Sequence, residues 1–244
     1  MPFERLLKGF AKFRLGYYRE HPELFEKLAT EGQSPEVLVI GCSDARVDPG
    51  ILAQARPGDI FTVRNISAMV PPAQPDERQH GTSSAIEYAV RGVEVRHVVV
   101  LGHALCGGIA ALVDGERSSA YASYDYLSTW TAIAQDVRDL AVRELAGKPR
   151  EQIARAVEQA VVLKSTVNLM SFPWLAERVI AGKLRLHAWW FNLAEGQLYA
   201  FNPGTARFEP VEGVDVTPTV AKDTSLSAIK PERLIAVAAG KPAL

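Results

Sequence analysis

Two short motifs contain the side chains of this sequence that are best suited to chemistry. Cys42, Asp44 and Arg46 alternate within the first motif, and His103 precedes Cys106 by three residues in the second. Cys42 and Cys106 are the only cysteines of the chain. Two thiolates and an imidazole form a donor set typical of zinc. Three protein ligands leave a fourth tetrahedral position open, which is the pattern of a catalytic zinc site rather than a structural one.

Asp44 has two alternative roles in such a site. It could bind the metal as a fourth ligand and close the site. It could instead form a bidentate ion pair with Arg46 and leave the fourth position to a water molecule. Zinc would then lower the pKa of that water toward about 7. Because two thiolates donate charge to the metal, we expect a weaker effect than three imidazoles give. The pairing with Arg46 favours the second role.

The two motifs follow apolar runs that must position them. Residues 37–41 precede Cys42 and residues 97–101 precede His103. Continuous apolar runs of this length are typical of buried parallel strands. Further strands are expected at 60–65, 184–193, 197–201 and 206–208, and helices at 84–91, 109–113, 119–146, 150–170 and 173–181. This alternation predicts an α/β fold with a central, mostly parallel sheet flanked by helices. Ligands bind such sheets beyond the carboxyl ends of the strands.

The chain before the first strand predicts a helical arm. Apolar residues recur at steps of three and four between Leu6 and Tyr17, as an amphipathic helix requires. We interpret residues 1–210 as one domain, with an arm at 1–32 and an α/β core at 33–210. Residues 211–244 form a C-terminal extension of unknown role, with one helix expected at 229–239. The arm has no core of its own, so it must pack on its own domain or on a partner subunit.

The composition excludes several classes of protein. The 244 residues have a formal net charge of −1, so the clustered basic excess of a nucleic-acid-binding protein is not expected. No apolar run approaches the ~20 residues that cross a bilayer, and no secretory signal is visible. We therefore expect a cytoplasmic protein without a membrane or nucleic-acid partner. In a reducing compartment, two cysteines indicate metal binding or catalysis rather than a disulfide framework.

The C-x-D-x-R motif at Cys42 and the H-x-x-C-G-G motif at His103 together resemble those of the β-class carbonic anhydrases. The resemblance covers about residues 33–201 and is closest to the plant-type branch. That branch has similar residues at 33–35, 57–58, 61, 63–65, 69–72, 81–82 and 85–88. The resemblance implies a carbonate dehydratase, in which zinc-bound hydroxide converts carbon dioxide reversibly to bicarbonate and a proton.

The resemblance also implies a set of site residues. One zinc ion per subunit would be bound by Cys42, His103 and Cys106. Asp44 and Arg46 would form the catalytic dyad. The substrate pocket would be lined by Gln33, Phe61, Ile66, Tyr88 and Gly107. In the family these pocket residues come from both subunits of a tight dimer, and the N-terminal helices embrace the partner. A homodimer or a dimer-based oligomer, such as a tetramer, is therefore expected.

Two other functions remain open at this point. The same site could hydrolyse carbonyl sulfide or carbon disulfide, which are linear electrophiles open to the same nucleophile. Alternatively, the chain could be a non-enzymatic zinc protein, such as a bicarbonate sensor, with Asp44 permanently on the metal. Gln33 and Arg46 argue against this second alternative, because a purely structural zinc site has no use for them.

Overall fold

The computed structural model describes residues 1–76, 78–115 and 124–211. The described strands form one sheet in the order β2-β1-β3-β4-β5-β6. Their bounds are β1 (Val37–Cys42), β2 (Ile60–Asn65), β3 (His97–His103), β4 (Arg185–Asn192), β5 (Gln197–Asn202) and β6 (Arg207–Pro210). Strands β1 to β4 pair in parallel, and β5 and β6 continue the sheet antiparallel. The predicted α/β fold with a mostly parallel sheet is confirmed.

The two central strands are apolar on both faces, as their sequences predicted. Leu38 and Ile40 of β1 and Val98 and Val100 of β3 are completely buried beneath helices. Val99 of β3 lies on the opposite face in a smaller apolar cluster. β1 and β3 are thus neighbouring strands buried on both faces, and their carboxyl ends hold Cys42 and His103.

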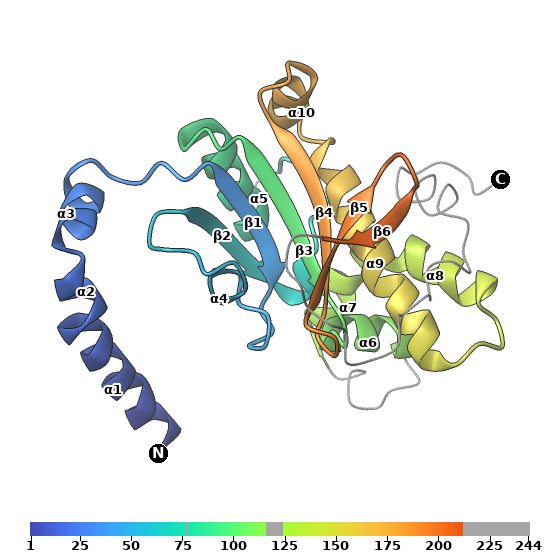
Figure 1. Ribbon diagram of the computed structural model, residues 1–244. Helices are drawn as coiled ribbons and strands as arrows, with labels where there is room; N and C mark the ends of the chain where they lie inside the picture. The colour runs from blue at the N-terminus through green and yellow to red at the C-terminus, as the bar shows by residue number, and fades with distance from the viewer. Residues whose placement is uncertain (77, 116–123, 212–244) are drawn as a thin grey trace.

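Helices cover the sheet, mainly on one face (Figure 1). Their bounds are α4 (Pro49–Leu52), α5 (Gly81–Glu87), α6 (Gly107–Asp114), α7 (Leu127–Thr131), α8 (Gln135–Glu144), α9 (Arg150–Leu169) and α10 (Pro173–Ile180). The long helix α9 lies directly against β3 and β4. A Cβ built on Gly102 would lie 2.3 Å from Cγ2 of Val162, so helix and strand can approach this closely only because residue 102 is glycine.

The continuous helix predicted at 119–146 is wrong over its described part. The chain forms α7, a 3₁₀ turn at Ala132–Ala134 and then α8. The Thr131 hydroxyl donates hydrogen bonds to the carbonyls of Leu127 and Ser128. Such bonds bend a helix slightly, and the backbone leaves the helical region three residues later, at Ala134, with a φ of −114° and a ψ of 19°. The helix expected at 229–239 lies outside the described residues.

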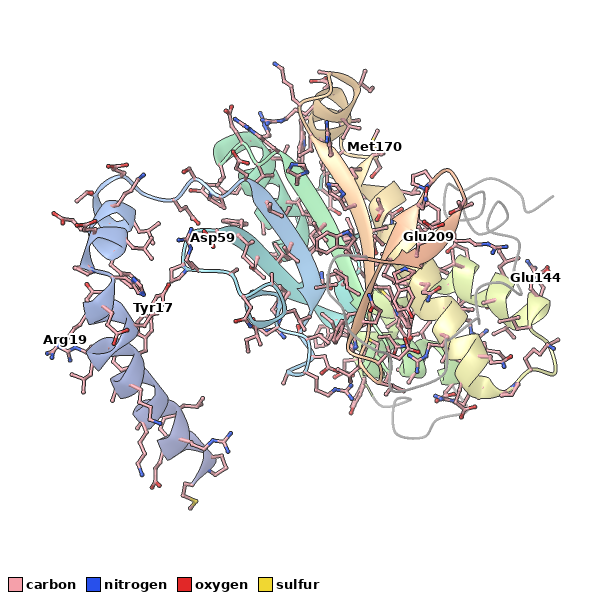
Figure 2. All side chains as sticks on the ribbon, in the orientation of Figure 1. Tyr17, Arg19, Asp59, Glu144, Met170 and Glu209 are labelled. Atoms are coloured by element: carbon pink, nitrogen blue, oxygen red, sulfur yellow. The ribbon has the colours of Figure 1, made fainter. Side chains whose placement is uncertain are left out.

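The N-terminal arm is helical but stands away from the sheet (Figure 1). It consists of α1 (Pro2–Leu15), α2 (Tyr17–Glu20) and α3 (Pro22–Thr30), and none of the described residues in these helices is buried. Tyr17 lies on the side of the arm that faces the sheet, and Arg19 points outward (Figure 2). Leu28 packs against Gly58, which has a φ of +94°. The arm therefore presents most of its apolar surface to solvent within a single chain.

Within the described ranges, none of the helices combines the length and apolar character that crossing a bilayer requires.

Candidate active site

The ends of two neighbouring strands and the start of one helix bring three metal-binding side chains together. Cys42 ends β1, His103 ends β3, and Cys106 is the N-cap of α6. The two Sγ atoms are 4.0 Å apart, and the three donor atoms lie within 4.8 Å of one another. All three residues are buried. The structure thus assembles the donor set that was predicted from the sequence.

The orientation of His103 fits a metal ligand. Its Nδ1 donates a hydrogen bond of 2.8 Å to the Ala104 carbonyl. This bond leaves the lone pair of the imidazole on Nε2. That Nε2 atom is buried and has no hydrogen-bond partner among the described residues. Because an unpaired buried polar atom is costly, a metal ion with the two sulfurs as further ligands would stabilise it.

The two cysteine side chains are hydrogen-bonded to each other. Their hydrogen bond, together with burial, raises the pKa of Cys42 to about 12. The same hydrogen bond lowers the pKa of Cys106 to about 7, and donors from Ser67 and the first turn of α6 act in the same direction. At neutral pH the pair therefore retains at least one proton. Binding a dication requires the release of that proton.

Asp44 is paired with Arg46. Arg46 donates to Oδ1 from Nε at 2.9 Å and from its backbone N–H at 3.0 Å, and to Oδ2 from Nη2 at 2.7 Å. The same Nη2 also donates to the Leu105 carbonyl. These bonds hold the pKa of Asp44 well below its usual range. Oδ2 lies 3.9 Å from Nε2 of His103, so an ionised carboxylate faces the three donor atoms.

Arg64 fixes the loop that contains Asp44. Its guanidinium donates to the carbonyls of Cys42 at 2.9 Å and Asp44 at 2.7 Å, and to Oδ2 of Asp48 at 2.6 Å. The sequence predicted only that Arg64 lies near the carboxyl end of a strand. Its role in shaping the loop depends on a fold that brings residues about 20 positions apart into contact, which no local pattern reveals.

A buried carboxylate supports the α6 side of the site. Glu158 is 4% exposed and accepts the Cys106 backbone N–H at 3.3 Å. Arg155 pairs with it at 2.7 Å and lies over the Trp190 ring. Burial raises the pKa of Glu158, against the attraction of Arg155. Sequence analysis missed this group, although a charged residue inside the apolar run at 156–163 was the available signal.

The predicted pocket residues fall into two groups. Ile66 and Gly107 lie beside the three metal-binding residues Cys42, His103 and Cys106, which we call the donor cluster. Ile66 approaches Gly108, and Gly107 follows Cys106. Phe61 pairs with Leu38 at the other end of β1. That position is four residues, or about 13 Å, from the end of the sheet that holds Cys42.

The remaining pocket residues lie on the side of Phe61. The rings of Phe61 and Tyr88 have centroids 5.9 Å apart, and Gln33 is exposed in the segment before β1. One chain therefore does not bring these three residues to the donor cluster. Their role in binding substrate stays a prediction.

A largely apolar cleft of about 840 Å³ opens beside the site. Its walls include Ser43, next to Cys42, as well as Ile66 and Trp130. The Trp130 indole donates to the Ile66 carbonyl at 2.8 Å, so α7 is tied to this wall. An apolar cleft at a buried cluster of donor atoms suits a small uncharged substrate.

Comparisons with known proteins agree with this geometry. The family model described as carbonic anhydrase matches residues 37–198. A carbonic anhydrase of Synechocystis is 30% identical, over 94% of this chain and 78% of its own length. β-Carbonic anhydrase 3 of Arabidopsis thaliana is 31% identical, over 79% of this chain and 74% of its own length.

Solved structures lead to the same family. The β-carbonic anhydrase CcaA has a TM-score of 0.80 at 30% identity, over 86% of this chain and 100% of its own. A structure from work on two tetrameric β-carbonic anhydrases of Sordaria macrospora has a TM-score of 0.70 at 29% identity. The match covers 86% of this chain and 96% of that structure's chain. The match of the family model, the two motifs and the donor cluster coincide, so this chain belongs to the β-carbonic anhydrase family.

Proposed function

We propose that this chain hydrates carbon dioxide reversibly to bicarbonate and a proton, with Cys42, His103 and Cys106 as the ligands of one zinc ion. The observation that carries the proposal is the buried cluster of two sulfurs and an Nε2 atom that has no hydrogen-bond partner in the described part of the chain. When bound there, zinc supplies a Lewis acid that lowers the pKa of water and makes it nucleophilic near neutral pH.

Asp44 would accept a hydrogen bond from the attacking water through Oδ2. Arg46 occupies both carboxylate oxygens and keeps the group ionised, so Asp44 acts as an acceptor and not as a fourth ligand. An acceptor held in this place orients the lone pair of the water toward carbon. The same pairing argues against a bicarbonate sensor whose zinc is permanently closed by Asp44.

Carbon dioxide would reach the site along the apolar cleft. Ile66 and Trp130 offer carbon dioxide an uncharged surface, and Ser43, the sequence neighbour of Cys42, also lines the cleft. Bicarbonate, being charged, is held weakly by such walls and leaves toward solvent. The chemistry of the cleft therefore fits an apolar substrate and a charged product.

We further propose that a second copy of this chain completes the pocket. Phe61 and Tyr88 lie at the β2 edge, away from their own donor cluster, and Tyr88 is 57% exposed. Phe3, Leu6 and Phe10 of the arm are 61–70% exposed, more than a lone chain in water favours. The work on the Sordaria macrospora relatives describes tetrameric enzymes, which supports a dimer-based assembly.

Comparing two substrates tests the proposed reaction. Purified zinc-loaded protein should hydrate carbon dioxide far faster than it hydrolyses carbonyl sulfide, with proton release and sulfide release as the two readouts. The reverse order would assign the chain to the hydrolysis of sulfur analogues. Failure to act on either substrate, with one zinc bound per chain, would favour the non-enzymatic alternative.

A further inference from the structure

We propose that Ser67 is a positioning residue that donates hydrogen bonds to both cysteine ligands and thereby limits the charge they give to the metal. This inference rests on the proposed zinc site. Neither motif contains Ser67, which lies in the 3₁₀ turn at Ile66–Ala68 between β2 and α5.

Ser67 contacts both sulfurs at once. Its backbone N–H donates to Sγ of Cys42 at 3.4 Å, and its Oγ lies 3.3 Å from Sγ of Cys106. The residue is only 4% exposed. Once a metal ion has displaced the thiol protons, neither sulfur has a hydrogen to donate. The Ser67 hydroxyl must then be the donor to Cys106, and both contacts become charge-assisted hydrogen bonds.

The backbone at Ser67 adopts a conformation that serine rarely does. Its φ of 66° and ψ of 19° lie in the left-handed region. The surrounding turn enforces this conformation, because Asn65 both accepts the Met69 N–H and donates to the Met69 carbonyl, at 2.9 and 2.8 Å. Trp130 holds the Ile66 carbonyl from outside the turn. Strained backbone that is fixed from several sides is typical of functional sites.

The start of α6 accommodates this serine. A Cβ built on Gly108 would lie 2.3 Å from Oγ of Ser67 and 2.5 Å from Cγ2 of Ile66. Only a glycine at position 108 therefore lets the hydroxyl reach Cys106. The second glycine of the H-x-x-C-G-G motif thus has a steric role here, which is to leave room for the Ser67 hydroxyl.

The electronic consequence concerns a site with two thiolates. Each hydrogen bond to a thiolate stabilises the sulfur lone pairs and reduces their donation to the metal. Two donors from one residue would offset part of the charge that Cys42 and Cys106 bring. The metal would therefore remain a stronger Lewis acid than it would be with two thiolates that accept no hydrogen bonds.

Cobalt substitution provides a direct test. Co²⁺ bound in place of zinc gives thiolate-to-metal charge-transfer absorption, whose energy reports the sulfur lone pairs. We expect Ser67→Ala and Ser67→Gly to move this band to longer wavelength and to weaken zinc binding about 10-fold in a chelator competition. Ser84→Ala, which removes a hydroxyl that donates to the carbonyls of His80 and Gly81 at the start of α5, should change neither quantity.

The two Ser67 variants separate the hydroxyl from the backbone. Alanine keeps the Cβ of serine at this positive φ, so Ser67→Ala removes the hydroxyl alone, whereas Ser67→Gly also removes the conformational strain. A shift in the glycine variant alone would assign the effect to the backbone and overturn the inference. An unchanged band in both variants would also overturn it. If wild-type protein bound Co²⁺ without thiolate charge transfer, the proposed zinc site itself would fail instead.

Discussion

Asp44 remains charged over the whole neutral range because Arg46 donates three hydrogen bonds to it. We predict that Asp44→Asn, which keeps the shape of the side chain, lowers kcat/KM for carbon dioxide by at least about 100-fold, the usual contribution of a positioned proton acceptor. Zinc content should not change, because Asp44 is outside the donor cluster.

Asp59→Asn is the matched control for this substitution. Asp59 also pairs with an arginine, Arg56, but the pair is exposed at the turn before β2. Stopped-flow hydration assays of both variants at equal zinc content would make the comparison. Full activity in Asp44→Asn would remove the carboxylate from the mechanism.

The thiol pair predicts how zinc affinity depends on pH. Between about pH 8 and 10, Cys106 is mostly ionised and Cys42, with a pKa of about 12, is still protonated. Each zinc ion that binds must then displace at least the Cys42 proton, so the apparent affinity should rise by at least about 10-fold per pH unit. Competition with a chelating dye of known pH response measures this slope. An affinity independent of pH in that range would contradict the shared proton.

At this scale the sequence revealed the ligands but not their support. Cys42, His103 and Cys106 have side chains of distinctive chemistry and follow or begin predictable elements. Ser67 and Glu158 are common residues. Each acts through a contact with Cys106, which is 39 positions from Ser67 and 52 positions from Glu158 in the sequence. Such contacts depend on the packed fold, so no local spacing could predict them.

Among the elements, helix α9 and strand β3 determine where His103 lies. Gly102→Ala would place a methyl group 2.3 Å from Val162, in the residue just before the histidine. We predict a free energy of unfolding about 1–3 kcal/mol lower, the typical cost of overpacking, together with weaker zinc binding. Urea denaturation of the zinc-loaded protein measures the change.

Gly9→Ala in α1 is the control, because its new Cβ would meet nothing within 4 Å in its own chain. Alanine favours a helix interior by roughly 0.5–1 kcal/mol over glycine, so this variant should be at least as stable as wild type. Equal stability of Gly102→Ala and wild type would mean that α9 moves away from β3 without cost.

Strands β1 and β3 were predictable because their burial on both faces leaves continuous apolar runs in the sequence. The break between α7 and α8 was not, since the backbone leaves the helical region at Ala134, an alanine, which by itself favours a helix interior. The division of the chain at residue 210 stays a prediction.

At the scale of the whole molecule, the arm has an apolar surface that remains exposed in the described structure of one chain. We predict that the double variant Leu7→Glu, Phe10→Glu dissociates the assembly, as measured by light scattering after size-exclusion chromatography, because charges would enter the proposed interface. Its activity should fall as well, since the proposed pocket takes Phe61 and Tyr88 from a second copy.

The control reverses two charges on the same helix, in Lys8→Glu, Lys12→Glu. Both lysines lie among the polar residues of α1. This variant should assemble like wild type if the apolar face makes the interface. A fully active monomer from the apolar-face variant would refute the shared pocket.

The measurement that tests the central claim most directly is carbon dioxide hydration by one preparation in three states. The purified protein is assayed as isolated, after removal of metal with a chelator, and after the return of one equivalent of zinc. Activity should be present, then lost, then restored in proportion to the zinc bound. Hydration at the uncatalysed rate in all three states, with one zinc bound per folded chain in the last, would contradict the account.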